Sequence, residues 1–293
     1  MDTSTASADA MRPFRPPHKR EPWDTRWCST TFVHAKLSIL KGSEEGMAER
    51  KQVVAKLYEK AKLEADFEAA NRLVDLMWRD SVEDRIGDLV LAAGVRPIIA
   101  FPHPGFDDED CVDHDAGSRL TSRNALPFAI KERVRLATDG FENITIKQAA
   151  RVGRTKLARF PRFVFQPSFV GDVDPRRPYF LVDDTFTLGG TLAVMRSHIV
   201  RHGGTVIGAC ALAHSLGRDI PFAMTAEIRD LLFSVYGSEL DALWKGEIGH
   251  EPARLSDAEG RFLLDWSRDA RGGGASLLQQ LRARIDRART HCR

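Results

Sequence analysis

Apolar and charged positions alternate at three- and four-residue intervals between residues 43 and 94. This spacing places the apolar side chains on one face of a helix, so it predicts two or three amphipathic helices that pack on the segment after them. Gly94 is typical of a residue that ends a helix. The apolar positions are Val53, Val54, Leu57, Ala61, Leu73, Leu76, Met77, Val82, Ile86 and Leu89.

The pattern changes at residue 96, where short apolar runs begin to alternate with helical segments. Strands that alternate with helices imply βαβ units, so we predict an α/β fold with a largely parallel, twisted sheet flanked by helices. Helices are expected over 124–136 and 191–202. The runs that have the length and composition of buried strands are 97–101, 144–146, 179–182 and 205–212.

These patterns divide the chain into four parts. Residues 1–42 are a basic, proline-containing arm, 43–94 a helical N-terminal extension, 95–224 the α/β core and 225–293 a C-terminal helical region. The prolines of the arm prevent a regular helix, so we interpret the arm either as flexible or as a nucleic-acid-binding segment. Its tryptophans favour docking against the rest of the protein, because exposed tryptophans usually find an apolar partner.

Composition narrows the class of protein. The 293 residues are 43% hydrophobic and 29% charged with a formal net charge of +2, which fits a globular protein and gives no whole-molecule case for nucleic-acid binding. The cysteines, which show no CxxC spacing, favour a reduced, intracellular chain. No apolar run reaches the roughly 20 residues that cross a bilayer. The basic N-terminus lacks the apolar stretch of a signal peptide, so we expect a cytoplasmic protein with no membrane partner.

The strongest chemical signal follows the third predicted strand. Asp183 and Asp184 are succeeded by a turn rich in threonine and glycine, and a helix begins near Thr191. Backbone N–H groups at a helix start bind phosphate, and Gly189 and Gly190 let the backbone approach a ligand closely. Paired carboxylates accept hydrogen bonds from vicinal hydroxyls. The order of these features predicts a ribose 5-phosphate site; the simpler interpretation is an acidic turn before a capped helix.

Residues 179–192 resemble the fingerprint of the type I phosphoribosyltransferases: four apolar residues, two acids, a Thr/Gly loop and a threonine at the helix start. Residues 122–127 and 148–156 resemble elements of a less characterised bacterial and mobile-element branch, with Ser122 and Lys156 in place of its glycines. The resemblance implies a type I phosphoribosyltransferase-like fold. It also implies Mg²⁺-dependent transfer of phosphoribose from 5-phosphoribosyl 1-pyrophosphate (PRPP) to a nitrogen heterocycle, with release of pyrophosphate.

The resemblance also implies roles for individual residues. Asp183 and Asp184 are expected to hold the ribose hydroxyls, directly or through Mg²⁺, and so to be both catalytic residues and metal ligands. Arg154 and Lys156, in a basic loop, are the other catalytic candidates. The 5-phosphate is expected to contact Thr185, Phe186, Thr187, Leu188, Gly189, Gly190 and Thr191, and the pyrophosphate His103, Arg119, Arg123 and Arg151.

Each basic residue proposed for ligand binding also has a simpler interpretation. The loop 151–162 is a lid over phosphates, a solvated basic loop or a nucleic-acid patch. Arg119 and Arg123 bind pyrophosphate or only face solvent. His103 and His214, each after a predicted strand, contact the ligand or are packed histidines.

Three functions from different classes follow. The first is the phosphoribosyltransferase, an enzyme of a family whose members are often homodimers. The second is a non-catalytic regulator that senses PRPP or a nucleotide and binds nucleic acid or a protein partner, as the basic residues Lys19 and Arg20 suggest. The third is a scaffold that survives as an interaction module, whose C-terminal helices form a partner surface or simply cover the sheet.

Overall fold

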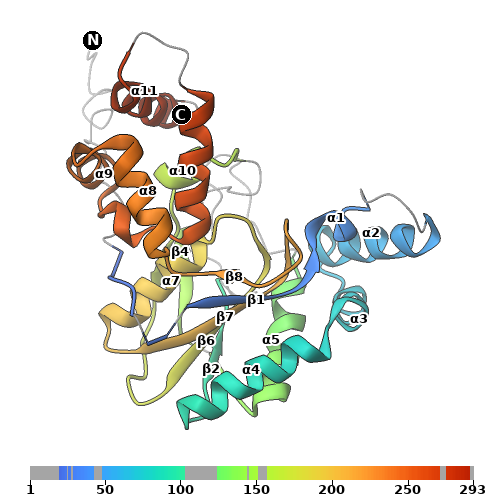
Figure 1. Ribbon diagram of the computed structural model, residues 1–293. Helices are drawn as coiled ribbons and strands as arrows, with labels where there is room; N and C mark the ends of the chain where they lie inside the picture. The colour runs from blue at the N-terminus through green and yellow to red at the C-terminus, as the bar shows by residue number, and fades with distance from the viewer. Residues whose placement is uncertain are drawn as a thin grey trace, which may run out of the picture.

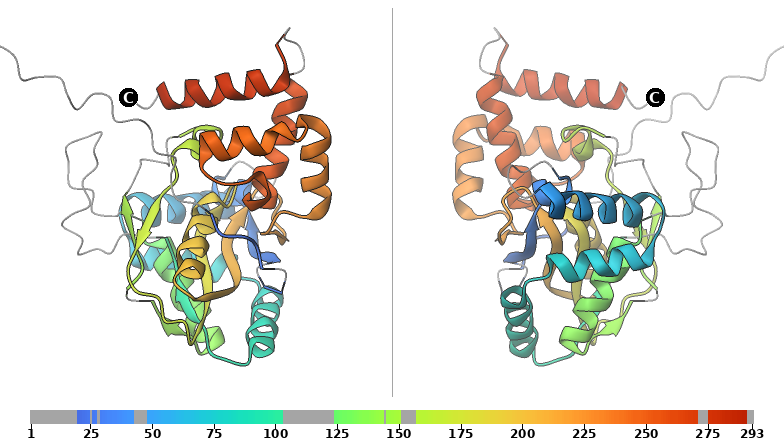
Figure 2. Two further views of the ribbon diagram at one scale, coloured as in Figure 1. Left: turned by 90° about the vertical axis from the view of Figure 1, so that its left-hand side faces the viewer. Right: turned by 90° about the vertical axis from the view of Figure 1, so that its right-hand side faces the viewer.

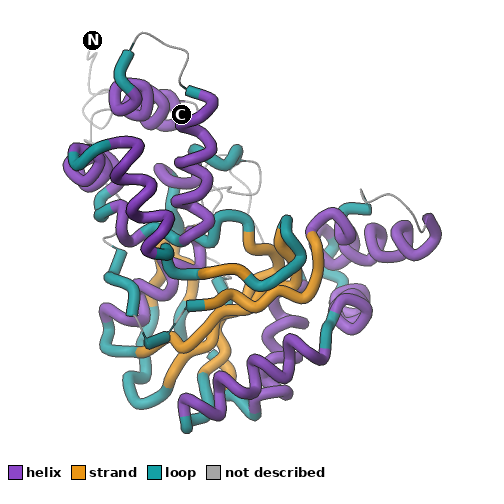
Figure 3. The backbone as a smooth tube through the Cα atoms, in the orientation of Figure 1, coloured by secondary structure: helices purple, strands orange, loops and turns teal. Residues whose placement is uncertain are grey.

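A central sheet with helices on both faces forms the α/β core of this computed structural model (Figures 1 and 3). The structure describes residues 20–24, 26–27, 29–42, 48–102, 124–143, 145–150, 157–270 and 275–290. Six strands lie in the order β3-β2-β6-β7-β1-β8. They span β1 Thr30–Lys36, β2 Ile98–Ala100, β3 Phe141–Glu142, β6 Pro178–Phe186, β7 Thr205–His214 and β8 Ile220–Pro221.

The sheet is mixed. Neighbouring strands from β3 to β1 pair in parallel, whereas β8 pairs with β1 in the antiparallel sense. The prediction of an α/β fold with a helix-flanked sheet is confirmed, and the expected largely parallel sheet gains an antiparallel edge.

Side chains of β6 alternate between the two faces of the sheet, as the period of a strand requires. Phe180 and Val182 belong to the core under the N-terminal helices, and Tyr179 and Leu181 to the core under α7. Burial on both faces explains the uninterrupted apolar run at the start of β6. The helices of the first face are α1 Leu37–Leu40, α2 Ala48–Leu63, α3 Phe67–Met77, α4 Asp80–Ala93 and α5 Leu126–Thr138, and α7 spans Gly190–Arg201.

Part of the predicted N-terminal arm is a strand of the sheet. Residues 30–36, which the sequence pattern assigned to the arm, form β1 and pair in parallel with β7, Val33 opposite Ala211. Val33 is fully buried. The prediction failed here because β1 acquires its neighbour from a segment far along the chain, a tertiary contact that no local pattern of residues shows.

Two strands lie on either side of the strand predicted over 144–146. β3 ends before it, and β4 (Lys147–Ala150) begins after it and pairs with β5 (Ser168–Val170) in a separate two-stranded sheet. The Asn143 side chain closes the turn between them, because its oxygen accepts from the Ile146 N–H at 3.3 Å and its nitrogen donates to the Ile146 carbonyl at 2.9 Å. This local hydrogen bonding competes with strand pairing.

The C-terminal helices build a core of their own beyond the sheet (Figure 2). Trp244 and Leu281 are fully buried in it, together with Phe163. Each helix in the described ranges is too short or too polar to span a bilayer. The elements of this region are α8 Ala226–Tyr236, α9 Glu239–Ile248, η2 Pro252–Arg254, α10 Asp257–Asp269 and α11 Leu277–Thr290, and the short helix α6 Pro161–Val164 packs against them.

Residues 20–24, which we call the strap, fasten this helical region to α7. The Arg20 guanidinium and the Glu259 carboxylate form an ion pair in which the side chains are 1% and 2% exposed, with Nη2 donating to Oε1 at 2.8 Å. The Glu21 N–H donates to Ser197 on α7, and the Trp23 indole donates to the Leu255 carbonyl. The strap therefore ties three parts of the chain together.

Replacing Arg20 with methionine is expected to lower the free energy of unfolding by about 3–5 kcal/mol, because Glu259 would keep a buried, uncompensated charge. Urea unfolding at neutral pH measures this. Arg201→Met is the control: its pair with Glu21 is partly exposed and is expected to contribute at most about 1 kcal/mol. Equal losses in the two variants would contradict the role given to Arg20.

Candidate functional site

Asp183 and Asp184 lie at the carboxyl end of β6, inside the strand and not in a turn after it. Ligands of open α/β sheets bind at this end of the strands. Alternation along the strand turns Asp184 toward the face of α2 and α5 and Asp183 toward the face of α7. Asp184 is 6% exposed, whereas Asp183 is half-buried. The Asp184 N–H donates to Asp183 Oδ1 at 2.8 Å, and the two carboxyls are close enough to affect each other's pKa.

Asp184 has a full set of partners from other elements. Lys62, on α2, places its Nζ 2.6 Å from Asp184 Oδ2, and Asn124, before α5, donates to the same oxygen at 3.0 Å. Thr185 donates to the other oxygen at 3.2 Å. The Lys62 ammonium also donates to the Tyr58 hydroxyl at 3.0 Å. The ammonium of Lys62 therefore neutralises Asp184 from within the protein.

The pKa values of the two carboxyls are shifted in opposite directions. Burial raises the pKa of Asp183 well above its usual value, and the negative charge of Asp184 raises it further. Burial alone would also raise the pKa of Asp184, but the Lys62 charge and the hydrogen bonds from Lys62 and Asn124 outweigh it and lower this pKa to about 2. Asp184 raises the pKa of Lys62 against the effect of burial. Two carboxylates thus share one ammonium, which leaves one negative charge unmatched when both are ionised.

The predicted phosphate loop is a tight turn whose apolar members are buried. Gly189 has a φ of 76°, and a Cβ there would lie 2.2 Å from the Phe186 ring, so glycine is required on both counts. The Phe186 ring packs against Phe222 in the core. The Leu188 side chain is buried in the core of the C-terminal helices, and the Ser256 hydroxyl donates to its carbonyl.

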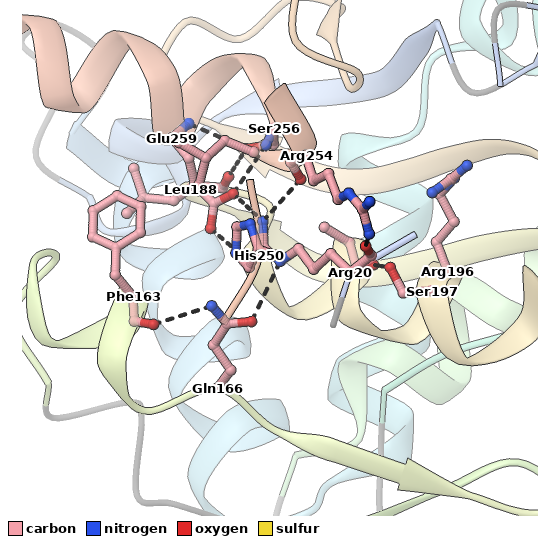
Figure 4. A network of polar contacts seen from close by, with 12 residues as sticks. Arg20, Phe163, Gln166, Leu188, Arg196, Ser197, His250, Arg254, Ser256 and Glu259 are labelled. Carbon is pink, nitrogen blue, oxygen red and sulfur yellow. Dashed lines mark hydrogen bonds and ion pairs between the residues drawn. The ribbon is translucent and has the colours of Figure 1, made fainter. Parts of the chain in front are cut away.

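A carboxylate of the protein itself lies close to the start of α7; Figure 4 shows this residue, Glu259, with Arg20, Ser256 and Leu188. A Cβ on Gly190 would lie 2.6 Å from Glu259 Oε1 and 3.2 Å from Arg20 Nη2. Glu259 also closes the capping box of α10 by accepting from the Ser256 N–H at 2.9 Å. A carboxylate near a helix start meets the partial positive charge there. A carboxylate and its counter-ion therefore lie beside Gly190, one of the residues that were expected to contact the 5-phosphate.

Most of the other predicted site residues lie outside the described residues: His103, Arg119, Arg123, Arg151, Arg154 and Lys156. His214 ends β7 and is buried, with its Nδ1 accepting from the Leu216 N–H at 3.2 Å. Burial, and then the charge of Arg159, lower the pKa of His214. This placement fits the interpretation of a packed histidine. Within the described ranges, no three metal-ligating side chains form a group.

Sequence reasoning missed two residues that shape this region. Lys62 lies 122 residues from Asp184 and has no local signal, because a lysine near the end of an amphipathic helix usually faces solvent. One role of Glu259 could have been predicted from the sequence. Ser256 with Glu259 three positions later is the pattern of a capping box, and both hydrogen bonds of that box are present. The pattern does not show that the box lies against the start of α7.

No protein-family model matches the chain. The chain is similar to Protein TraN of Escherichia coli, with 29% identity over 207 residues, which cover 70% of this chain and 42% of that protein. It is also similar to an uncharacterized protein of Haemophilus influenzae, with 28% identity over 149 residues, 50% of this chain and 29% of that protein. The chain thus matches less than half of the length of each relative.

This similarity corrects the predicted function. Over 70% of its length the chain matches a protein named TraN and not a phosphoribosyltransferase, so the prediction of phosphoribose transfer from PRPP is wrong, together with its alternative, a sensor of that compound. In the structure Glu259 lies beside Gly190 at the start of α7, and Lys62 holds the carboxylate that was expected to bind ribose hydroxyls.

Lys62→Met is expected to lower the free energy of unfolding at neutral pH by about 3–5 kcal/mol, because Asp184 would lose its counter-ion in a buried position. In the unchanged protein the folded pKa of Asp184, about 2, lies below the ordinary value of about 3.9. Its contribution is therefore complete above about pH 4 and is lost as the pH falls through about 2. The variant should lose this acid dependence.

Urea unfolding from pH 2 to pH 7 would measure both effects. Lys56→Met, on the exposed side of the same helix, is the matched control and should change little. An unchanged acid dependence in Lys62→Met would rule out this ion pair as its source.

Asp183→Asn is expected to raise the melting temperature at neutral and alkaline pH. The raised pKa of Asp183 means that ionising this carboxyl costs more in the folded than in the unfolded protein, so its contribution to stability is lost as the pH rises through that pKa. Asparagine removes the charge and keeps the shape. The gain should disappear in acid, where Asp183 is protonated in both states; a gain independent of pH would contradict this explanation.

Proposed function

We propose that this chain is a small-molecule-binding α/β protein whose ligand presents a cation to Asp183 at the carboxyl end of β6. The observation that carries the proposal is the charge balance of this site. Lys62 pairs with Asp184 at 2.6 Å, while Asp183 lies beside it half-buried with a raised pKa, and no salt bridge of Asp183 is found among the described residues. Burial and the charge of Asp184 raise this pKa, and a bound cation would offset both, so the site favours a cationic ligand.

Mg²⁺ is the cation that we propose. It commonly binds proteins through one or two carboxylates and takes its remaining oxygens from water and from the ligand. Asp184 Oδ2 is already used by Lys62 and Asn124, so Asp183 is the protein ligand that fits. With a single carboxylate, Mg²⁺ alone should bind weakly and the polar ligand should strengthen its binding. An ammonium group of an organic ligand is the alternative cation that could pair with Asp183.

We also propose, for the architecture alone, that the sheet is of the type I phosphoribosyltransferase-like kind. The support is the order of elements along the chain: a short β4–β5 sheet, an acid pair at the end of β6, a glycine turn and then α7. That the chain is an enzyme, and that it is cytoplasmic, stay predictions. Protein TraN is longer than the part that this chain matches, so the proposal concerns the matched α/β unit and not that whole protein.

The proposal is tested by titrating the full chain with Mg²⁺ by calorimetry, and with Mn²⁺ by electron paramagnetic resonance. Binding should be lost in Asp183→Asn and should strengthen as the pH rises, because Mg²⁺ competes with the proton on Asp183. Asp172→Asn, an exposed acid after β5, is the matched control and should bind normally. Binding that is indifferent to Asp183 and to pH would overturn the Mg²⁺ site, and a response to alkylammonium ions alone would assign the site to an amine.

A further inference from the structure

His250 is enclosed where the strap meets the C-terminal helices (Figure 4). This histidine is 3% exposed. Its Nδ1 lies 2.8 Å from the carbonyl oxygen of Glu251, and a carbonyl oxygen can only accept, so Nδ1 carries the proton of the neutral ring. Nε2 therefore has a lone pair, and no described residue donates to this buried atom. The ring has one nitrogen that is able to take up a second proton.

Two guanidinium groups oppose that proton. Arg20 acts on His250 from the strap and Arg254 acts on it from η2. The ring on the side of α9, that of Trp244, is uncharged and lies edge-on, with 6.5 Å between the ring centroids. An imidazolium at this position would therefore face two like charges in a place that water does not reach.

The carboxylates of this region already have partners. Both oxygens of Glu259, on α10, accept from Arg20, at 2.5 and 2.8 Å. The Glu251 carboxylate, 38% exposed, pairs with Lys245 at 3.4 Å and with Arg254 at 3.1 Å. Both acids are thus matched by cations before His250 gains a charge, so among the described residues neither is left to compensate an imidazolium.

The backbone of the strap is held at the same place. Arg254 donates to the Arg20 carbonyl. On α7, the Arg196 guanidinium donates to the carbonyls of Glu21 and Pro22, at 3.2 and 2.6 Å. The strap is extended and belongs to no helix, whereas Arg254 lies within η2. A repulsion between His250 and its two arginines is therefore relieved with least disruption when Arg20 leaves.

We propose that the strap is an acid-sensitive latch, in which protonation of His250 expels Arg20 and releases residues 20–24 from α7 and η2. Once Arg20 has left, water enters the space beside the imidazole and hydrates its charge. The released segment takes Trp23 away from Phe222, with which its ring makes an edge contact at 5.0 Å in the closed form. This latch is independent of the cation site proposed at Asp183.

The latch responds in weak acid. Burial, and then Arg20, lower the pKa of His250 in the closed form to about 3. A hydrated histidine has a pKa of about 6.5. The closed form is therefore fully stabilised above about pH 6.5 and loses stability as the pH falls from there toward about 3. With the hydrated value for the released form, the ratio of released to closed protein rises about thirtyfold between pH 7.5 and pH 5.

The test is hydrogen–deuterium exchange of the full chain between pH 7.5 and pH 5, followed by mass spectrometry of the segment 21–24. Dividing each rate by the intrinsic rate at the same pH gives the released fraction. This fraction should rise about thirtyfold in the unchanged protein but less than about threefold in His250→Gln. Glutamine is able to donate to the Glu251 carbonyl as the histidine does, and it does not titrate.

His34→Gln is the matched control. His34 is also 3% exposed, and burial and then Arg79 lower its pKa to about 3, but it stacks on Trp78 in the core under the N-terminal helices. This variant should keep the thirtyfold response of the strap. An equal loss of response in His34→Gln would show that exchange at the strap follows unfolding of the whole protein, and it would overturn the latch.

Two further outcomes would also overturn it. A full acid response in His250→Gln would assign the release to the carboxylates that acid protonates, such as Glu259. A response below about threefold in the unchanged protein would mean that His250 does not control the strap, and this measurement needs no variant to fold. Circular dichroism verifies the fold of each variant. Asp183→Asn should keep the latch, so this proposal and the proposed function can fail independently.

Discussion

The buried ion pair between Arg20 and Glu259 is the contact on which the arrangement of the molecule depends. It joins the strap to α10, and it lies against Gly190 at the start of α7. Burying two charges costs several kcal/mol of hydration, which good geometry and further hydrogen bonds only balance. Arg20 meets this condition with additional bonds to Gln166 and to the Arg254 carbonyl. The pair thus fixes where the C-terminal helices sit on the sheet rather than adding much net stability.

The same pair lies against the start of α7. A glycine turn before a helix offers N–H groups to an anion, and a sequence pattern alone suggests a ligand for them. In this chain the Glu259 carboxylate lies beside Gly190 and Arg20 balances its charge, while the neighbouring His250 is kept neutral because burial, and then Arg20, lower its pKa to about 3. Both glycines are explained by packing, since neither position has room for a Cβ.

Charges of the protein also balance each other at the end of β6, but there the balance is incomplete. Lys62 and Asn124 satisfy Asp184, but they do so on one face of the sheet, and Asp183 turns to the other face. One strand therefore presents a neutralised and an unmatched carboxyl side by side. This asymmetry follows from the period of the strand, and it is why the proposed cation site involves Asp183 and not the pair.

The sequence by itself determined the elements that local physics controls. The apolar run before Asp183 is a strand because it is buried on both faces, and the spacing of Leu73, Met77 and Ile86 forms helices because their burial follows the helical period. The tertiary structure alone decided that residues 30–36 enter the sheet, that Lys62 reaches Asp184 across 122 residues and that Glu259 reaches Gly190. These contacts join segments that share no local pattern. The chemistry of a site depends on such distant partners. The motif at 179–192 therefore predicted the strand and the glycine turn, but not the side chains that contact them.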